Sequence, residues 1–229
     1  MLHTTQGIVL SYIKYKESSI IAKVFTEALG LQAYIIQGVR AKKPKYSVAL
    51  FQPLTLLDMV VYHKKQRGIQ RMAEVQRYTL NSNILVNVHK GVIAIFIAEF
   101  LAKVIREEER NEKLFDFLWQ AVTRLNEQDA GYEAFYLTFM LQLSHYLGFG
   151  ISTIQDVYAQ LRRSGQHWDI DQKALEGLNT LLLPGTVYEH IKMDKFVKRR
   201  ATEAIIKFYQ LHIDTLDTLK SLKILQEIS

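Results

Sequence analysis

The spacing of hydrophobic residues divides the chain into two parts. Up to about residue 80, short runs rich in β-branched and aromatic residues are separated by turn residues, a pattern typical of strands. Beyond that point, apolar residues recur at spacings of three and four, as on one face of a helix. No flexible linker separates the parts. We therefore expect one domain over 1–80, packed against a second domain over 81–229.

The first part is expected to form strands over 7–16, 18–27, 31–38, 54–63 and 69–78. Five short strands joined by turns within about 75 residues predict a small antiparallel barrel or sandwich. The alternation of apolar and polar residues is blurred, so periodicity alone leaves the choice between the two open.

The second part is expected to be helical, which makes the fold class α+β. Helices are expected over 88–110, 114–125, 171–182 (ended by Pro184-Gly185) and from a cap at Asp194 through His212. Between them runs an amphipathic stripe that we interpret as core, made of Tyr132, Phe135, Tyr136, Phe139, Met140, Leu143 and Leu147. Gly148 suits the C-terminal cap of that helix, and Trp119 lies on the apolar face of the helix before it.

Positive charge is concentrated in the first part. Residues 1–80 hold 12 lysines and arginines against 4 acids, whereas the remainder is near neutral. Four cations fall on one expected loop, Gly38–Ser47, as Arg40, Lys42, Lys43 and Lys45. This asymmetry indicates an anionic partner for the N-terminal part; a solubility bias is the alternative.

The motifs that usually mark an enzyme are missing. There is no cysteine, no glycine-rich phosphate loop and no paired metal-binding histidine motif. His145 and His212 lie in amphipathic helices and are interpreted as structural, and the acidic run Glu107–Glu109 as a solvated surface. The N-terminus has no signal-peptide pattern, and the longest apolar run is too short to cross a membrane. We expect no enzyme activity, no metal and no cofactor.

Nucleic-acid binding requires cations along a phosphate path, and flat side chains where bases are unstacked. The candidate DNA-binding cations are Lys14, Lys16, Arg40, Lys42, Lys43, Lys45, Lys64, Lys65, Arg67 and Arg71. Tyr15 and Tyr46 are candidates for base stacking, with core or plain surface roles as the alternative. No base-specific reader is recognisable, so weak sequence preference and strong salt dependence are expected.

Several short motifs together resemble a known family. They are Val9-Leu10, Tyr15-Lys16-Glu17-Ser18, Phe25-Thr26 followed by Gly30, Gly38-Val39-Arg40, FQPLTLLDMVVY, MAEVQRY and, at the far end, FYQLHIDTLDTLKSLKILQEI. In this order and separation the chain resembles the bacterial recombination-mediator protein RecO. Each motif alone is moderately specific, but the resemblance covers most of the chain.

The resemblance implies an N-terminal oligonucleotide-binding (OB) barrel followed by an all-helical domain. It also implies binding of single- and double-stranded DNA, annealing of complementary strands, and loading of RecA onto strands coated by single-strand-binding protein. The implied partners are RecR, the acidic C-terminal tail of single-strand-binding protein and, indirectly, RecA. The implied location is cytoplasmic and nucleoid-associated, with no membrane contact.

One feature of the resembled family is absent. Many of its members carry a four-cysteine zinc site after the helix that ends here at Gly148, and this chain has no cysteine. The resemblance therefore indicates a zinc-free branch, in which packing holds the irregular stretch 164–171. Residues 150–185 are where the resemblance says least.

A partner tail that is acidic and ends in apolar residues requires a hydrophobic pocket rimmed by cations. Lys195, Lys198, Arg199 and Arg200 are the candidates for that rim, with a solvated helix face as the alternative. An alternative for the whole protein is an adaptor whose basic barrel contacts acidic protein tails rather than DNA. A nuclease is a third hypothesis, but the only acids of the basic part are Glu17, Glu27, Asp58 and Glu74.

Overall fold

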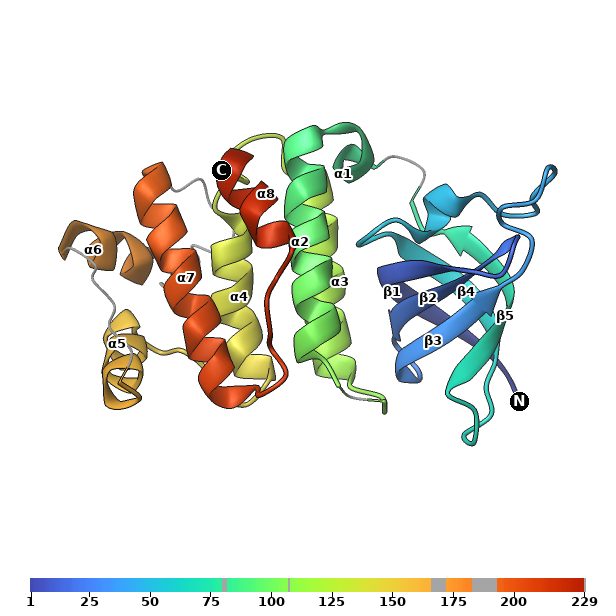
Figure 1. The fold of residues 1–229 in the computed structure, drawn as a ribbon, viewed down its shortest axis with the longest axis horizontal. Helices are drawn as coiled ribbons and strands as arrows, with labels where there is room; N and C mark the ends of the chain where they lie inside the picture. The colour runs from blue at the N-terminus through green and yellow to red at the C-terminus, as the bar shows by residue number, and fades with distance from the viewer. Residues whose placement is uncertain (80–81, 107, 166–171, 183–192, 229) are drawn as a thin grey trace.

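A β-barrel stands at one end of the molecule, and layered helices extend from it to the other end (Figure 1). The computed structural model describes residues 1–79, 82–106, 108–165, 172–182 and 193–228. The strands are β1 (Leu2–Tyr15), β2 (Ser19–Thr26), β3 (Gly30–Ile36), β4 (Leu56–Tyr62) and β5 (Ile69–Arg77). All five expected strands are confirmed, and β1 begins at Leu2 rather than Gly7.

The sheet closes into a barrel in the order β1-β2-β3-β5-β4. β1 closes it by pairing with both β2 and β4. Four of the pairings are antiparallel, but β3 and β5 are parallel. A ring with an odd number of strands cannot alternate direction throughout, so one seam must be parallel. The barrel is therefore confirmed over the sandwich, and its antiparallel pairing holds everywhere except this seam.

A bulge bends the long strand β1, which pairs with β4 along its first half and with β2 along its second half. Its register shifts between Val9 and Ser11, which leaves Leu10 as a bulge. Gly7 lies just before the bulge and opposite both Thr26 and Leu57. A Cβ atom on Gly7 would come within 2.7 Å of the Met59 and Val24 side chains. The barrel interior is thus packed so closely here that only glycine fits.

Between β3 and β4 the barrel part contains a short 3₁₀ turn, η1 (Val48–Phe51). The helical part begins with α1 (Asn83–Val86) and α2 (Val88–Val104). The other helices are α3 (Glu112–Glu127), α4 (Phe135–Tyr146), α5 (Ile154–Arg163), α6 (Gln172–Leu181), α7 (Lys195–His212) and α8 (Ser221–Ile228). α1, α5 and α8 were not expected. No helix among the described residues is long and apolar enough to cross a membrane.

One expected helix is shorter than its sequence pattern. α2 ends at Val104, not Arg110, because Ile105 turns to an extended conformation and is buried. The acidic residues Glu108 and Glu109 therefore lie outside a helix. They are exposed, as expected of a solvated surface.

The expected helix caps are confirmed. Asp194 accepts a hydrogen bond from the backbone N–H of Phe196 at 2.7 Å and begins α7. Gly148 follows α4 with a left-handed φ of 87°. The aromatic stripe of α4 is buried except for Leu147, which is half-buried at the C-cap, and Tyr132 precedes the helix. Pro184-Gly185 and most of the 164–171 stretch lie outside the described residues.

Side chains of the barrel contribute to the hydrophobic core of the helical part. Ile8 and Leu10 of β1 and Phe25 of β2 point out of the barrel and belong to the core of the helical part. Phe25 packs against Phe115 of α3 with ring centroids 6.1 Å apart. A separate cluster that includes Val9, Val24 and Tyr34 fills the barrel. The two parts pack together, as expected.

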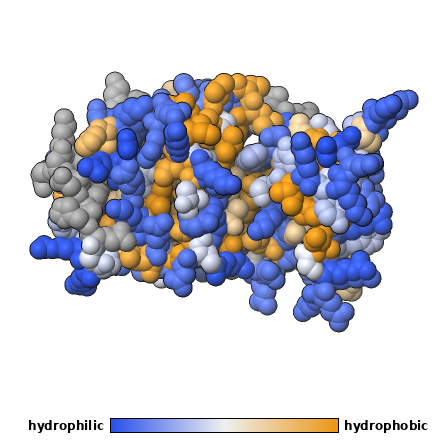
Figure 2. All heavy atoms as spheres, viewed as in Figure 1, coloured by the Kyte–Doolittle hydropathy of each residue, from blue (hydrophilic) through white to orange (hydrophobic). Residues whose placement is uncertain are grey.

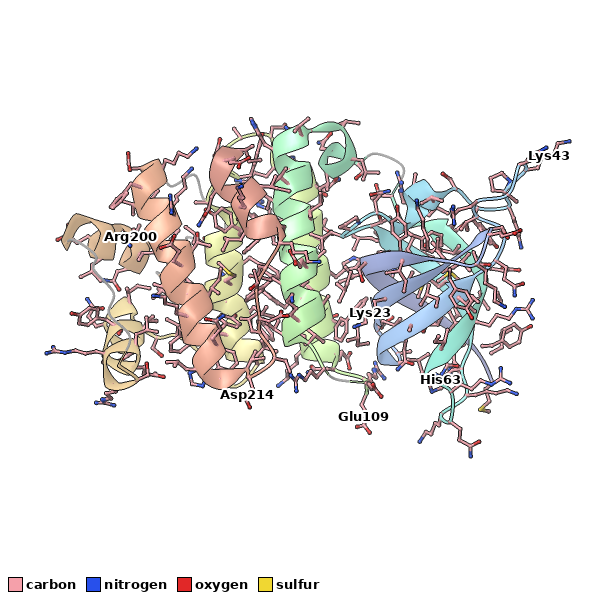
Figure 3. The ribbon with its side chains drawn as sticks, viewed as in Figure 1. Lys23, Lys43, His63, Glu109, Arg200 and Asp214 are labelled. Carbon is pink, nitrogen blue, oxygen red and sulfur yellow. The ribbon has the colours of Figure 1, made fainter. Side chains whose placement is uncertain are left out.

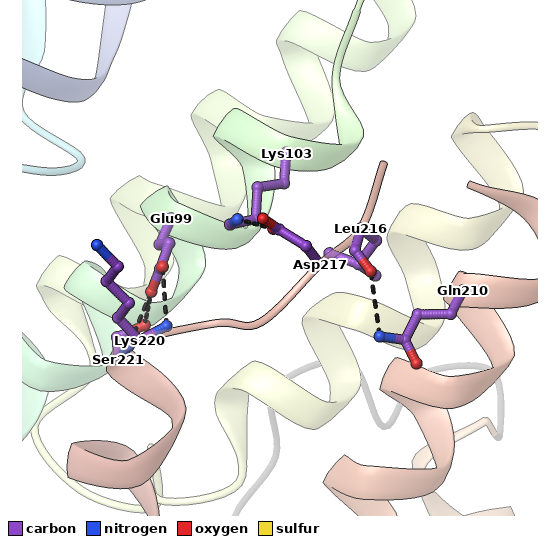
Figure 4. Close-up of polar contacts among 7 residues, drawn as sticks. All are labelled: Glu99, Lys103, Gln210, Leu216, Asp217, Lys220 and Ser221. Carbon is purple, nitrogen blue, oxygen red and sulfur yellow. Dashed lines mark hydrogen bonds and ion pairs between the residues drawn. The ribbon is translucent and has the colours of Figure 1, made fainter. Parts of the chain in front are cut away.

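After α7 the chain returns across the helices to α2 (Figure 4). Lys103 of α2 forms an ion pair with Asp217 on the returning segment. Glu99, one turn earlier, accepts hydrogen bonds from the backbone N–H groups of Lys220 and Ser221. These contacts fix the start of α8 against α2.

Candidate nucleic-acid interface

The β1–β2 turn and the basic loop Gly38–Ser47 meet at one end of the barrel. The backbone N–H of Arg40 donates to the carbonyl of Ser18 at 3.0 Å. The Arg40 guanidinium donates to the carbonyl of Lys16 at 3.4 Å. Lys16 was expected on the strand over 7–16, but it lies in the turn after β1, with a left-handed φ of 51°. The turn thus brings Lys16 beside Arg40.

The basic loop is anchored at its base and open to solvent beyond it. Val39 is buried in the barrel cluster, and Gly38 accepts a hydrogen bond from the Ala41 N–H at 3.1 Å. Arg40, Lys42, Lys43 and Lys45 are all exposed. Lys43 lies at the projecting tip (Figure 3). An anchored loop with exposed cations presents positive charge to a ligand without removing it from water.

The two candidate stacking residues have different environments. Tyr15 is 37% exposed, and Lys16 Nζ lies 5.5 Å from its ring centroid. Tyr46 is half-buried, packs against the barrel cluster and donates its hydroxyl to the carbonyl of Ala73 at 3.4 Å. Lys45 lies over the Tyr46 ring at 4.9 Å, and its hydrogen bond to Tyr46 raises the pKa of Lys45. The ring of Tyr15 is therefore more accessible for base stacking than the ring of Tyr46.

A second basic group surrounds the β4–β5 turn. Lys64, Arg67 and Arg71 line a hollow of about 310 Å³ with Tyr62, Ile35, Ile69 and Gln70. The Arg71 guanidinium lies 5.9 Å from the centroid of the Tyr62 ring. Lys65 is exposed on the same turn. This geometry places a cation beside a half-exposed aromatic ring.

Gln70, which the sequence analysis did not single out, shapes this turn. Its side chain is buried and donates to the carbonyls of Lys64 and Arg67 at 2.9 and 2.7 Å. Its side-chain oxygen, Oε1, accepts a hydrogen bond from the backbone N–H of Lys64 at 3.0 Å. A buried amide with its hydrogen bonds satisfied holds the loop in one conformation. Gln70 thereby positions the backbone that carries the cations.

A row of outward-facing side chains connects the two basic groups across the sheet. Neighbouring strands pair Ile13 with Ile21, Ile21 with Ile35, Ile35 with Arg71, and Arg71 with Tyr62. The next residues along β2 and β3 point into the barrel. Ile13 is 62% exposed. Ile21 and Ile35 are half-buried, so this row is an apolar track between two cationic ends. Figure 2 shows apolar atoms on part of the barrel surface.

The predicted cations therefore form two groups. Lys43 of the first group and His63, the residue before Lys64 of the second, lie toward opposite ends of the barrel in Figure 3. Lys14 is exposed near the end of β1 opposite Ile20, on the side of the sheet that faces the barrel mouth. Burial lowers the pKa of His63, and the nearby charges of His3, the N-terminus and Lys65 lower it further.

The four cations at the start of α7, proposed as the rim of a pocket for a partner tail, have different environments. Lys198 is buried, and this burial lowers its pKa. Arg199 and Arg200 both approach Glu203, at 3.1 and 3.8 Å. Lys195 donates to the carbonyl of Glu227 at 2.9 Å. Their role in binding a partner tail stays a prediction.

The two histidines interpreted as structural make structural contacts. His145 Nε2 lies 3.1 Å from the carbonyl of Ile151. His212 stacks on Phe149 at 4.6 Å, and burial lowers its pKa. Within the described ranges, no group of three histidines, aspartates or glutamates is placed to hold a metal ion.

The connection from α4 to α5 is held by hydrogen bonds. Ser144 is fully buried, donates to the carbonyl of Leu141 at 2.6 Å and accepts from the N–H of Ile151 at 3.0 Å. With His145 bound to the same residue, these contacts bridge the loop beyond Gly148. Side-chain hydrogen bonds thus stabilise this connection in a chain without cysteine.

Two family models match the chain in the order of its two parts. The model for the recombination protein O N-terminal region matches residues 1–79, and the model for its C-terminal region matches residues 87–223. The chain belongs to the recombination protein O (RecO) family. The gap between the two matches, residues 80–86, contains α1.

Full-length relatives agree with this membership. A protein of Christiangramia forsetii named DNA repair protein RecO is 32% identical, covering 100% of this chain and 99% of its own. DNA repair protein RecO of Flavobacterium johnsoniae is 32% identical over 98% of each chain. The one of Bacteroides fragilis is 28% identical over 100% of this chain and 99% of its own.

Proposed function

We propose that this RecO-family protein acts in DNA repair as a non-enzymatic recombination mediator. It binds single- and double-stranded DNA, anneals complementary strands and helps to load RecA onto DNA coated by single-strand-binding protein. The observation that carries the proposal is the barrel face itself, with a cationic group at each end of a partly exposed row of side chains. Family membership supports the pathway in which this surface would act.

The physical basis of annealing is charge neutralisation. Two strands approach each other only when part of their phosphate charge is screened or paired. The exposed loop cations Arg40, Lys42 and Lys43 suit that task because they remain in contact with water, and cations on phosphates bind a backbone without reading its sequence. Such contacts release counterions, so binding should weaken steeply as salt is raised.

The proposed protein partners are RecR and the C-terminal tail of single-strand-binding protein, with RecA engaged indirectly. Remodelling a coated strand requires a DNA site and a contact with the coating protein at the same time. The barrel supplies the first. The candidates for the contact with the coating protein are Lys195, Arg199 and Arg200. They are exposed or half-exposed near the ring of Phe196, which is 62% exposed.

One observation favours a second candidate, a protein-interaction adaptor. The row between the two basic groups contains Ile13, Ile21 and Ile35, and branched aliphatic side chains pack on proteins better than they stack on bases. In that case the cations would meet an acidic protein segment. An adaptor would show no affinity for short oligonucleotides at moderate salt.

The deciding experiment is fluorescence anisotropy of a labelled single-stranded oligonucleotide at two salt concentrations. We expect salt-sensitive binding that is weakened, with a smaller salt slope, in the Arg40→Glu/Lys42→Glu variant. The matched control is Arg162→Glu/Arg163→Glu, an equal charge change on exposed residues of α5 at the far end of the molecule. Equal loss in both variants would mean that overall charge, not the loop, governs binding. No binding at low salt would refute a DNA site.

A further inference from the structure

A large groove runs between the end of the barrel and the helices. Its volume is about 1070 Å³. The barrel side contributes Arg77 and Tyr78 at the end of β5, and the helical side contributes Trp119 of α3 and Tyr146 of α4. This volume is at the upper limit for sites that bury a small ligand. The groove has room for an extended segment of a polymer.

Aromatic side chains from both parts of the protein are presented in this groove. Tyr78 is 51% exposed and meets Trp119 edge to face, with ring centroids 4.8 Å apart. Trp119 is half-buried and rests on Phe115 at 5.5 Å. Farther along, Tyr146 is 42% exposed and lies parallel to Phe117 at 4.4 Å. Rings that are supported on one side and open on the other suit flat ligands.

Arg77 places an incompletely paired cation in the same groove. Its Nη2 donates to the carbonyl of Ala49 at 3.2 Å, while its Nε is buried with no hydrogen-bond partner among the described residues. A guanidinium has five N–H donors, and leaving buried donors unpaired is costly. A small shift of this side chain toward an anion in the groove would satisfy them.

The charges of the rim also favour an anion. Lys113 and Arg124 of α3 line the groove and are exposed, so with Arg77 it contains three cations. Asp116 and Glu127 are the acids that line it. These carboxylates are acceptors for the amino groups of bases, while the cations serve phosphates.

We infer that this groove binds a segment of single-stranded nucleic acid, with unstacked bases against Tyr78 and Trp119 and a phosphate at Arg77. Duplex DNA does not fit the chemistry, because the faces of its bases are covered by stacking. The inference rests on the proposed function and adds to it a site separate from the basic loop. A strand held here would have its bases separated.

The site contains its own reporter. The chain has two tryptophans, Trp119 and Trp168, so the Trp168→Phe variant leaves Trp119 as the single fluorescent tryptophan. We would titrate this full-length variant with a short oligothymidylate and follow Trp119 emission, with anisotropy of a labelled copy of the oligonucleotide measured in parallel. The expected result is saturable quenching that follows the anisotropy curve.

Three variants in this background test the roles of the ring and the cation. Tyr78→Leu keeps an apolar side chain but removes the flat face, and is expected to weaken binding to the groove roughly tenfold. Tyr78→Phe keeps the ring and should bind like its parent, which separates stacking from a mere folding defect. Arg77→Gln should weaken quenching several-fold and reduce its salt dependence.

The outcomes separate this inference from the proposed function. Anisotropy that rises while Trp119 emission stays constant would overturn the groove and leave DNA binding standing. No change in either signal would refute both. Stronger quenching by an acidic, phenylalanine-ended peptide than by oligothymidylate would identify the groove as a peptide site instead. Equal quenching by duplex DNA would overturn the single-strand assignment.

Discussion

Glu99 of α2 caps α8 from a position 122 residues earlier in the chain. Its Oε2 accepts hydrogen bonds from the N–H of Ser221 at 2.8 Å and from the Ser221 hydroxyl, and its Oε1 accepts from the N–H of Lys220 at 2.9 Å. A carboxylate at a helix N-terminus satisfies open N–H donors and interacts favourably with the helix dipole. One side chain therefore fixes the C-terminal helix to the centre of the molecule.

The Glu99→Gln variant should be less stable by about 1–2 kcal/mol, because it loses a charged acceptor at a helix N-terminus. Urea unfolding followed by circular dichroism measures this change. Amide hydrogen exchange should accelerate at Lys220 and Ser221 while the barrel strands keep their protection. The control is Glu227→Gln, an exposed carboxylate on the same helix, which should leave stability unchanged. An equal loss in both variants would contradict the cap.

The same contact predicts how stability depends on pH. Burial alone would raise the pKa of Glu99, but the hydrogen bonds from Ser221 and Lys220 and the charge of Lys103 together lower it below its ordinary value of 4.5. A carboxyl with a lowered pKa contributes stability above its unfolded value and loses it as pH falls through the folded value. The difference between parent and Glu99→Gln should be constant well above pH 4.5 and should narrow below it. A difference that persists unchanged in acid would refute this.

Gly7→Ala should destabilise the barrel by about 1–3 kcal/mol, since the new methyl group would overlap buried side chains. Its Cβ would lie 2.7 Å from Cγ1 of Val24, a branched side chain with little freedom to move. Thermal unfolding of the purified variant measures the loss. Gly68→Ala is the matched control, because nothing lies within 4 Å of its Cβ position. Equal stability of the two variants would show that the barrel interior adapts.

The strands were predictable because their signals are local. Runs such as 18–27 combine β-branched residues with bounding turns, and each of them forms a strand. Periodicity alone could not decide between a closed barrel and a sandwich, because closure depends on β1 pairing with strands on both sides; the barrel was expected only from the family resemblance. α8 was missed for a related reason: the cap of this helix is Glu99, far away in the sequence, so no local start signal precedes Ser221.

Exposure of the basic loop followed directly from its composition, since Gly38 and Pro44 oppose a helix and charged side chains favour water. The sequence could not show that Tyr46 is partly buried, because tyrosine occurs both on surfaces and in cores. Nor could it show that Lys198 is buried, because lysine is rarely found in a core. The role of Gln70 and the groove beside Trp119 depend on contacts between segments distant in the chain. Such contacts leave no periodic signal.

The last prediction concerns the two cationic groups of the barrel. If one strand runs along the outer row from the basic loop to the β4–β5 turn, neutralising either group should reduce the salt dependence of binding. The Lys64→Gln/Lys65→Gln/Arg67→Gln variant should lower the slope of log affinity against log salt by about 2, because each phosphate contact to single-stranded DNA contributes about 0.7. The side chains are exposed, so folding should be unaffected. A long oligonucleotide should lose affinity in this variant and in Arg40→Glu/Lys42→Glu, and the two losses should add. A very short oligonucleotide can contact only one of the two cationic groups, so its affinity should fall in only one of the two variants. A slope unchanged by the triple substitution would limit the DNA path to the basic loop.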